Sequence, residues 1–271
     1  MRIMHIVYFC TTPTAELLVQ LETSILLCKK EAPDIQIHLY TDESSIGQRW
    51  PIIQHILTPE QLTQWQGPKG FFWRIKMQVI ADLCALYPND PILYLDADTL
   101  ALDLPGLQTQ LSAPMMHLNE GALGTLNTKT ERRTLRELDQ KTFQGITTTA
   151  QSAMFNAGVI ALPPGYGEAI EQAIALCDSY LETQAPPRLL EQLALSLTLN
   201  KNHLLKEAQP FIAHYWSTKD WWIPYLKHWL EQHGPTFEQR IKYIHTLDLK
   251  AHPYWAKRSN TARRLRKLLG M

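Results

Sequence analysis

Two aspartates, Asp96 and Asp98, stand one residue apart at the end of an apolar segment, in the sequence DPILYLDADTLAL (90–102). The run from Ile92 to Leu95 has the continuous apolar character of a buried strand. Residues i and i+2 at a strand end point to the same side, and neighbouring carboxylates repel each other unless one is protonated or a cation lies between them. Carboxylate oxygens suit Mg²⁺ or Mn²⁺, which typically also bind substrate phosphates. The pair therefore predicts a divalent cation that carries a diphosphate.

Three other interpretations share this local pattern. A phosphatase of the haloacid-dehalogenase type places Asp-x-Asp-x-Thr after an apolar strand, but here Thr99 follows the second aspartate directly and the segment lies in mid-chain. A calcium loop needs glycine at its sixth position and glutamate at its twelfth, which counted from Asp96 are Ala101 and Leu107, so this interpretation fails. The third interpretation stays open beside the phosphatase: one aspartate caps the next turn and the other is a solvated loop residue.

Strand and helix signals alternate along the first hundred residues. Apolar segments at 3–9, 35–42 and 91–95 predict strands, whereas 14–30 and 73–86 have the spacing of helices with one apolar face. A loop rich in Pro, Gln and Gly is expected between the second strand and the second of these helices. Alternating units predict an α/β fold with a mostly parallel central sheet flanked by helices. Ligands in such sheets bind beyond the carboxyl ends of the strands, where Asp96 and Asp98 lie.

Composition is that of an ordinary globular protein. Of the 271 residues, 45% are hydrophobic and 19% are charged, and the formal net charge is zero, which gives no general attraction to nucleic acid. The four cysteines are widely spaced without a C-x-x-C pair, so we expect reduced thiols in a cytoplasmic protein. The first ten residues are expected to form a strand rather than a signal peptide, and no apolar run has the length of a membrane-spanning helix.

The segment FFWRIKMQVIADLCALYPNDPILYLDADTLALDLPGL (71–107) resembles the centre of GT-A-fold glycosyltransferases. It is most similar to the retaining glycogenin and lipopolysaccharide galactosyltransferase-like family, in which an aromatic-Arg-hydrophobic helix precedes LYLDAD and a downstream leucine. The resemblance implies a single, Rossmann-like GT-A domain in which Asp96 and Asp98 form the DxD motif. One aspartate would contact the donor ribose and the metal, and the other the metal. Arg74 would reach the donor sugar or its phosphates, unless it is a surface helix residue.

Two later stretches continue the resemblance in the expected order. MFNAGVIALP (154–163) is similar to a strand whose asparagine and adjoining backbone contact the donor sugar, which assigns donor binding to Asn156, Ala157 and Gly158. LLEQLALSL (189–197) is similar to a helix that lines the sugar pocket near the reacting carbon, which assigns Glu191 and Gln192 to the catalytic site. Here Glu191 stands where the family has aspartate, one methylene shorter.

A further stretch, AHYWSTKDWW (213–222), resembles a late His-aromatic-x-Gly-x-x-Lys-Pro-Trp segment of the family. The resemblance implies that His214 completes the metal site and that Lys219, one residue closer to the histidine here, binds the diphosphate. Ser217 stands at the glycine position and Asp220 at the proline position. A histidine beside two carboxylates suits Mn²⁺. The alternative for His214 is a core histidine with a backbone partner.

Together these stretches predict metal-dependent transfer of a sugar from a nucleotide diphosphate, by resemblance uridine diphosphate, to a glycan or lipid-linked acceptor with retention. Mn²⁺ or Mg²⁺ and Lys219 would stabilise the leaving diphosphate, with Glu191 either a nucleophile or a neighbouring stabiliser of positive charge. Residues 119–152 are expected either to cover the acceptor or to form a surface excursion with one helix. A nucleotidylyltransferase is disfavoured because YFCTTPTAEL (8–17) has no glycine. A non-catalytic nucleotide-sugar or carbohydrate-binding protein is the alternative from another class.

Charge is unevenly distributed along the chain. Residues 255–271 carry six basic residues and no acid, which leaves 20 basic against 26 acidic residues in the remainder. In SNTARRLRKLLGM (259–271) the apolar residues recur at helical spacing between basic ones, and PYWAKR (253–258) adds two aromatics. We therefore expect a GT-A domain over 1–250 and a basic amphipathic tail over 251–271 that contacts the inner face of the membrane. The alternative is that the leucines dock on the domain, while binding to nucleic acid is disfavoured by the acidic remainder.

Overall fold

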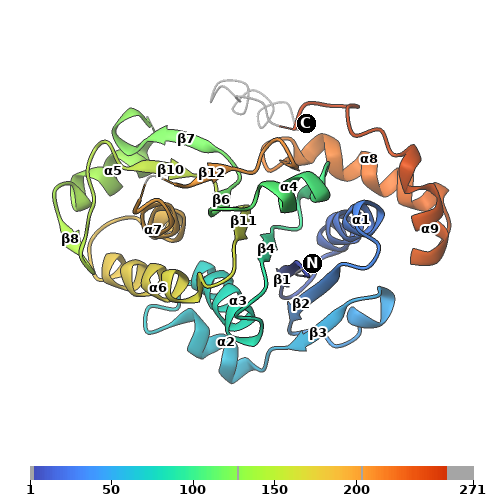
Figure 1. Ribbon diagram of the computed structural model, residues 1–271, viewed down its shortest axis with the longest axis horizontal. Coiled ribbons are helices and arrows are strands. Elements are labelled where there is room, and N and C mark those ends of the chain that lie inside the picture. Colours follow the sequence, from blue (N-terminus) through green and yellow to red (C-terminus); the bar gives the residue numbers. More distant parts are fainter. Residues whose placement is uncertain (1–2, 127, 203, 255–271) are drawn as a thin grey trace, which may run out of the picture.

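The structure, a computed structural model, describes residues 3–126, 128–202 and 204–254. Its centre is a seven-stranded sheet (Figure 1) in which β11 runs antiparallel to both of its neighbours, β4 and β6, and the other neighbouring strands are parallel. In spatial order the strands are β12 (Lys206–Glu207), β6 (Met115–Met116), β11 (Val159–Leu162), β4 (Ile92–Leu95), β1 (His5–Cys10), β2 (Gln36–Thr41) and β3 (Ile53–Ile56).

Three two-stranded pairs and the helices complete the fold. The pairs are β10 (Ala153–Phe155) with β7 (Asn119–Ala122), β13 (Ile212–His214) with β5 (Thr99–Ala101), and β8 (Thr142–Phe143) with β9 (Ile146–Thr147). The α-helices are α1 (Ala15–Glu31), α2 (Pro59–Gln66), α3 (Phe72–Leu86), α4 (Leu104–Gln110), α5 (Lys129–Leu138), α6 (Gly167–Leu181), α7 (Leu190–Leu199), α8 (Lys219–Gln232) and α9 (Phe237–Tyr243). Short 3₁₀ helices are η1 (Gly47–Arg49), η2 (Leu123–Thr125), η3 (Pro187–Leu189) and η4 (Ile244–Thr246).

The central strands divide their side chains between two apolar layers. Ile92 and Tyr94 of β4 belong to the layer formed with α3, α6 and α7, whereas Leu93 and Leu95 belong to the layer formed with α1, α8 and α9. Figure 1 shows these two sets of helices on opposite sides of the sheet. Because both faces are covered, the strands need apolar residues at every position, which explains the continuous apolar runs in the sequence. The predicted α/β fold with a mostly parallel sheet is confirmed.

The segment expected to be a loop after the second strand contains regular structure. β3 adds in parallel to the edge of β2, and α2 follows it. The start of α2 has a recognisable signal, since the Thr58 side chain accepts a hydrogen bond from the Gln61 backbone N–H and Pro59 occupies the first turn. Neither element shows a clear hydrophobic period, because β3 is only four residues long and α2 is rich in Gln.

The short pair β5–β13 determines what lies next to the end of β4. Three residues separate the end of β4 from the start of β5, and β13 pairs with β5 antiparallel, with His214 opposite Thr99. A residue more than a hundred positions away is thereby brought beside the two aspartates.

In the described part of the chain, no helix combines the length and apolarity needed to cross a bilayer.

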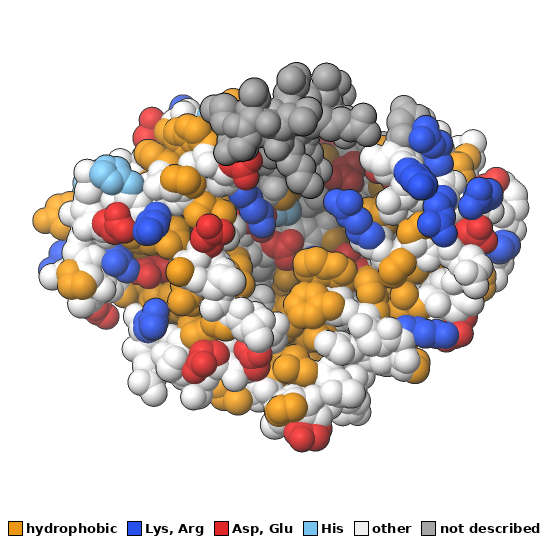
Figure 2. Space-filling model, turned by 180° about the vertical axis from the view of Figure 1, so that it is seen from behind, with side chains coloured by type: hydrophobic (Ala, Val, Ile, Leu, Met, Phe, Trp, Pro, Cys, Tyr) orange, Lys and Arg blue, Asp and Glu red, His pale blue; other side chains and the backbone are white. Residues whose placement is uncertain are grey.

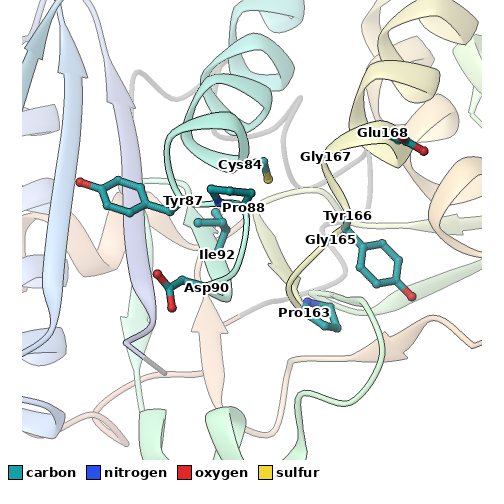
Figure 3. A pocket seen from close by; sticks show the side chains of 10 residues that line it. All are labelled: Cys84, Tyr87, Pro88, Asp90, Ile92, Pro163, Gly165, Tyr166, Gly167 and Glu168. Carbon is teal, nitrogen blue, oxygen red and sulfur yellow. The ribbon is translucent and has the colours of Figure 1, made fainter. Parts of the chain in front are cut away.

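A pocket lies near the opposite end of β4, between the end of α3 and the start of α6 (Figure 3). Its lining includes Tyr87, Pro88, Ile92 and Tyr166. Ile92 begins β4 and Asp96 follows its end, so about 13 Å of extended strand separates the pocket from the aspartates. None of the residues predicted to bind a metal or a donor lines this pocket.

Three histidines form a hydrogen-bonded row across neighbouring strands of the sheet. His5 Nδ1 lies 3.0 Å from His38 Nε2, and His38 Nδ1 lies 3.0 Å from His55 Nε2. Burial, with smaller contributions from the other two histidines, lowers the pKa of His38 to about 3. Burial also lowers the pKa of His5 and of His55. The row is therefore uncharged in the folded protein at neutral pH.

We expect the protein to become easier to unfold as the pH falls below about 6.5, the usual pKa of histidine. Below that pH the unfolded chain binds a proton at His38, whereas the folded chain does not until the pH approaches about 3. This histidine alone lowers the free energy of unfolding by about 1.4 kcal/mol per pH unit in that window. Urea unfolding at pH 7, 6, 5 and 4 measures the slope. His38→Gln should flatten it and the exposed His228→Gln should not; the same slope in all three proteins would contradict the assignment.

Candidate metal and donor site

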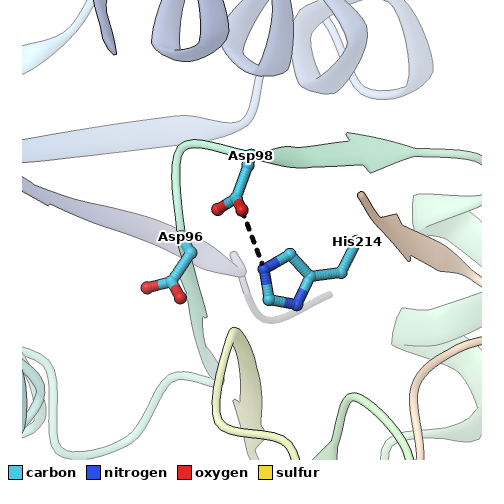
Figure 4. Close-up of side chains that lie close together, drawn as sticks. All are labelled: Asp96, Asp98 and His214. Atoms are coloured by element: carbon cyan, nitrogen blue, oxygen red, sulfur yellow. Dashed lines mark ion pairs between the residues drawn. The ribbon is translucent and has the colours of Figure 1, made fainter. Parts of the chain in front are cut away.

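The side chains of Asp96, Asp98 and His214 converge just beyond the carboxyl end of β4 (Figure 4). One ligand atom from each residue lies within 4.8 Å of the other two. His214 Nε2 is 3.2 Å from Asp98 Oδ2, and both of these side chains are buried, whereas Asp96 is partly exposed. Two carboxylates and an imidazole are a ligand set that suits Mn²⁺. This group of residues can therefore hold a divalent cation.

Backbone hydrogen bonds hold the two aspartates where β4 ends. The Asp96 N–H donates to the carbonyl of Gly158 (2.8 Å), and the Thr99 hydroxyl donates to the Asp96 carbonyl (2.8 Å). The Tyr215 N–H donates to the carbonyl of Asp98 (3.1 Å). The loop between β4 and β5 is thus pinned from both neighbouring segments, so that both carboxylates face the same space.

Asn156 determines the tautomer of His214, that is, which of its two ring nitrogens carries the proton in the neutral ring. The Asn156 amide nitrogen donates to Glu120 (3.2 Å), so its Oδ1 is the atom that accepts from the Gly158 N–H (3.1 Å). The same oxygen lies 3.0 Å from His214 Nδ1, which must therefore be the protonated nitrogen. In neutral His214 the lone pair is then on Nε2, directed toward Asp98. This arrangement, in which an outer partner fixes the tautomer of a metal-binding histidine, is common in metal sites.

Replacing Asn156 with alanine is expected to weaken Mn²⁺ binding by about 10- to 100-fold, the usual effect of losing such an outer partner. Calorimetric titration with Mn²⁺ in the presence of uridine diphosphate measures the change. The matched control is Asn200→Ala, at the end of α7, which should bind Mn²⁺ like the unmodified protein. Unchanged affinity in the Asn156 variant would remove Asn156 from the site.

Gly158 makes room for the imidazole of His214. A Cβ atom added at Gly158 would lie 2.1 Å from His214 Cε1 and 2.4 Å from Nδ1, closer than non-bonded atoms approach. Only glycine at this position therefore allows the histidine to reach the aspartates. The role predicted for Asn156, Ala157 and Gly158 in contacting the donor stays a prediction, and the structure places all three beside the candidate metal ligands.

Lys219 adds a positive charge to the same carboxylate. Its Nζ lies 2.8 Å from Asp98 Oδ2, and the side chain, at the start of α8, is 41% exposed and so accessible to a ligand. Burial on its own would raise the pKa of Asp98, but His214 and Lys219 outweigh it and hold this pKa well below its usual value. Asp98 is therefore ionised at neutral pH.

A buried lysine that the sequence interpretation missed connects the aspartates to α7. Lys76 Nζ lies 3.4 Å from Asp96 Oδ1 and 3.0 Å from Glu191 Oε1, and it donates to the carbonyl of Ala157 (3.2 Å). Only 4% of Lys76 is exposed. Burial on its own would lower its pKa, but Asp96 and Glu191 outweigh it and raise the pKa above the usual value. Lys76 is therefore a permanent cation between two of the predicted site residues.

Arg74, the residue predicted from resemblance to contact the donor, is held elsewhere in the structure. Its guanidinium donates to both carboxylate oxygens of Asp178 (2.8 and 3.0 Å) and to the carbonyl of Trp65 (2.8 Å). Residues two apart on a helix point to nearly opposite sides, so Arg74 and Lys76 cannot both face the end of β4. A donor contact by Arg74 stays a prediction, and the structure brings Lys76 rather than Arg74 to the aspartates.

Glu191 and Gln192 begin α7 and face different partners. Glu191 is buried against Lys76, whereas Gln192 donates to Glu120 (2.8 Å), the same carboxylate that accepts from Asn156. Glu120 of β7, also missed in the sequence, thus joins the start of α7 to the partner of the metal-site histidine. The segment around Glu120 has no hydrophobic period and no motif. Glu120 reaches the site through the pairing of β7 with β10, a tertiary contact that the sequence does not indicate.

His117 is a third residue that the sequence interpretation missed. It is buried, and its ring meets the His214 ring edge to face, with 5.2 Å between centroids. Within the described residues neither ring nitrogen of His117 has a hydrogen-bond partner. Burial and the neighbouring His214 lower the pKa of His117 to about 3, so this ring is neutral.

The face of the molecule seen in Figure 2 is hollowed near its middle, and acidic, basic and histidine side chains gather in the hollow. The predicted residues that the structure brings together come from four separated parts of the chain: the end of β4, the β10–β11 turn, the start of α7 and the β13–α8 junction. Lys76 and Lys219 form ion pairs with the carboxylates of Asp96, Asp98 and Glu191, and these pairs allow the cluster to be buried.

No protein-family model and no curated protein matches this sequence. Solved structures do match it. The glycosyltransferase GlyE of Streptococcus pneumoniae TIGR4 is similar over 95% of this chain and 66% of that chain, with a TM-score of 0.51 and 14% identity. The bifunctional glycosyltransferase WbbM is similar over 76% of this chain and 38% of that chain, with a TM-score of 0.50 and 12% identity. The galactosyltransferase LgtC, solved with donor and acceptor sugar analogues, is similar over 75% of this chain and 72% of that chain, with a TM-score of 0.46 and 15% identity.

The likeness to GlyE and WbbM shows the fold. The chain has the GT-A fold of these glycosyltransferases, as the resemblance of its central segment predicted. It spans about two thirds of the length of GlyE and 38% of the length of WbbM.

Proposed function

We propose that this protein is a metal-dependent glycosyltransferase that moves a sugar from a uridine diphosphate donor to a glycan or lipid-linked acceptor. The observation that carries the proposal is the group Asp96, Asp98 and His214, together with Lys219, at the carboxyl end of β4 in a GT-A fold. A group of this charge at a strand end fits a ligand that is itself a diphosphate with its cation.

Asp96, Asp98 and His214 would hold Mn²⁺ or Mg²⁺ in this proposal. A bound divalent metal neutralises negative charge on the diphosphate as the bond to the sugar breaks. Lys219 contributes a second cation on the same side, because its ammonium group reaches Asp98 from the exposed start of α8. Asn156 keeps His214 in the tautomer that presents Nε2, as its hydrogen bonds indicate.

Glu191 and Gln192 are proposed to line the pocket of the transferred sugar. Burial raises the pKa of Glu191 above its usual value, and Lys76, 3.0 Å away, opposes this shift and fixes the carboxyl group in position. An ionised carboxylate beside the reacting carbon favours the positive charge that develops there, which fits transfer with retention. We place the DxD role on Asp96 and Asp98, with Asp96 also reaching the ribose, and donor contacts on Arg74, Asn156, Ala157 and Gly158 as the resemblance implies.

A thermal-shift screen of nucleotide sugars with and without Mn²⁺ tests the proposal. A ligand at 100 times its dissociation constant stabilises the folded state by about 2.7 kcal/mol, which is a shift of several degrees. We expect at least one uridine diphosphate sugar to raise the melting temperature only when Mn²⁺ is present. A screen in which no nucleotide sugar raises it would count against the proposal, and binding without turnover would favour a non-catalytic nucleotide-sugar-binding protein.

The basic amphipathic segment 251–271 lies almost entirely outside the described residues, and its proposed role rests on sequence. We propose that it holds the 1–250 GT-A domain at the inner face of the membrane, as a cytoplasmic, peripheral protein. Each basic residue near an anionic leaflet contributes roughly 1 kcal/mol. The full chain should therefore sediment with phosphatidylglycerol liposomes at low salt and much less at high salt, and a chain ending at Pro253 should stay in the supernatant. Equal recovery of both chains in the lipid pellet would leave the tail without this role.

A further inference from the structure

Helix α5 carries a stripe of four cations on one side. Lys129, Arg132, Arg133 and Arg136 follow the spacing i, i+3, i+4, i+7, which places them on one helical face, and all four are exposed. We call this set the α5 stripe. Figure 2 shows Lys and Arg side chains gathered over this part of the molecule, on the same face as the hollow.

The stripe is unfavourable for the helix that carries it. Like charges three or four residues apart destabilise a helix by about 0.2–0.5 kcal/mol per pair, and the stripe contains four such pairs. Among the described residues, the one ion pair formed by the stripe joins Arg136 to Glu137, at 3.6 Å. The capping box of Thr128 and Glu131, with the buried Thr134 and Leu138, holds the helix instead. Contacts among the described residues therefore give the stripe little part in holding the helix.

The position of α5 relates the stripe to the sugar end of the site rather than the metal end. α5 packs against η2, which follows directly after the β7 strand of Glu120, and against η3, which leads into Glu191 at the start of α7. The metal end is formed instead by Asp96 and Asp98 with His214 of β13 and Lys219 of α8. The α5 stripe therefore lies on the Glu191 side of the site, where the acceptor would approach in the proposed function.

A lipid surface fits the stripe poorly. Helices that lie on membranes combine basic residues with exposed large apolar residues that enter the bilayer. The exposed large hydrophobic residues of the described chain include none between 124 and 150, and the apolar residues of α5 itself, Leu135 and Leu138, face the core. Arginine side chains, with five donors in a planar fork, pair readily with phosphate and carboxylate groups.

We propose that the α5 stripe binds anionic groups, phosphate or carboxylate, on the glycan acceptor and so selects an anionic glycan. The inference rests on the proposed glycosyltransferase function and narrows its acceptor class. Arg188 of η3, also exposed, extends the basic surface toward Glu191. Phosphate and uronic-acid carboxylate share the chemistry that the stripe recognises.

Three probes are used: a phosphorylated mannopentaose, a uronic-acid pentasaccharide and the neutral mannopentaose. Comparing them distinguishes recognition of a phosphate, of a carboxylate and of the sugar alone. Binding to the full chain is measured by calorimetry at two salt concentrations. We expect at least one anionic probe to bind about tenfold or more tightly than the neutral one, with the preference falling as salt rises. The variant Arg132→Gln/Arg133→Gln/Arg136→Gln should lose that preference. Its matched control, Lys227→Gln/Lys242→Gln/Lys250→Gln, removes the same charge from exposed positions on the α8–α9 side and should keep it.

Two outcomes would overturn the inference: equal binding of all three probes to the unmodified chain, or an anionic preference that the triple arginine variant retains. A third would replace it, namely loss of phosphatidylglycerol-vesicle binding in that variant with no change in glycan binding, because the stripe would then be a lipid surface. Stabilisation by a uridine diphosphate sugar with Mn²⁺, measured on the same variants, should be unaffected. That readout separates the two proposals, since its absence in every protein would count against the glycosyltransferase function and not against the stripe.

Discussion

Replacing Asp98 with asparagine is expected to lower the rate of sugar transfer by about a thousandfold or more. The change removes the negative charge that His214 and Lys219 both contact, and with it one of the three groups proposed to hold the metal. A catalytic metal stabilises developing charge by several kcal/mol. A change of about 1.4 kcal/mol in the activation free energy changes the rate tenfold. Because the pKa of Asp98 is held low, the native residue is fully ionised, so neutral asparagine is not a mimic of any state populated during the assay. The measurement is the release of uridine diphosphate from the preferred donor in the presence of Mn²⁺.

Asp103→Asn is the matched control. It makes the same chemical change five residues along, at the N-cap of α4, where the Asp103 side chain accepts a hydrogen bond from the Gly106 N–H (2.8 Å). Asparagine caps helices about as well as aspartate, so this variant should keep both its stability and its rate. If Asp98→Asn kept more than about a tenth of the native rate, the activation free energy would have risen by less than about 1.4 kcal/mol. That result would exclude an essential role for the Asp98 carboxylate.

Replacing Lys76 with methionine is expected to lower the free energy of unfolding by about 3–5 kcal/mol, the usual result of removing one partner from a buried ionic cluster. Methionine has a similar length, so the main change is electrical: Asp96 and Glu191 are left as two negative groups without the cation between them. Urea unfolding of the purified protein, at a pH near 7, measures the difference. The double variant Lys76→Met/Glu191→Gln removes one of the two stranded charges and should be more stable than the single variant.

The control for Lys76 is Lys69→Met. Lys69 also pairs with a carboxylate, Glu182 at 2.9 Å, but 45% and 63% of the two side chains are exposed. Exposed pairs of this kind contribute less than about 1 kcal/mol, so the control should unfold at nearly the native urea concentration. Equal effects of the two lysine substitutions, or a double variant no more stable than Lys76→Met, would contradict the account of Lys76 as the link between β4 and α7.

The elements that the sequence predicted are those whose side chains carry a clear period or a continuous apolar run. The helix expected over 14–30 is α1 (Ala15–Glu31), and the strand expected over 91–95 is β4 (Ile92–Leu95). β3 was missed because it is a four-residue edge strand with none of its side chains buried, and Gln54 and His55 interrupt its apolar character. β6 and β12 are two residues long, too short for any period, and their pairing depends on chain segments ninety positions apart.

The site divides in the same way. Asp96 and Asp98 are neighbours in sequence, so their proximity was predictable from the strand before them. His214 reaches them only through the β5–β13 pairing. Its role in the metal site was predicted from resemblance and not from spacing. Lys76 was missed because a lysine is ordinarily expected to be exposed, whereas this one is buried among the apolar residues of α3. Helical periodicity does indicate its direction, since it places Lys76 on the side of α3 opposite Arg74. Glu120 and His117 enter the site through tertiary pairing of β7 and β6 alone, for which one sequence carries no signal.

Turnover of a panel of uridine diphosphate sugars by the purified chain tests directly whether Asp96, Asp98 and His214 form a metal-dependent donor site. Release of uridine diphosphate is followed with Mn²⁺, with Mn²⁺ and excess chelator, and with the Asp98→Asn variant. We expect at least one donor to be cleaved with Mn²⁺, the chelator to abolish cleavage, and the Asp98→Asn variant to leave the donor intact. Cleavage that continues unchanged in chelator and in Asp98→Asn, or no binding and no cleavage of any donor, would contradict the assignment of this cluster as a metal-dependent donor site.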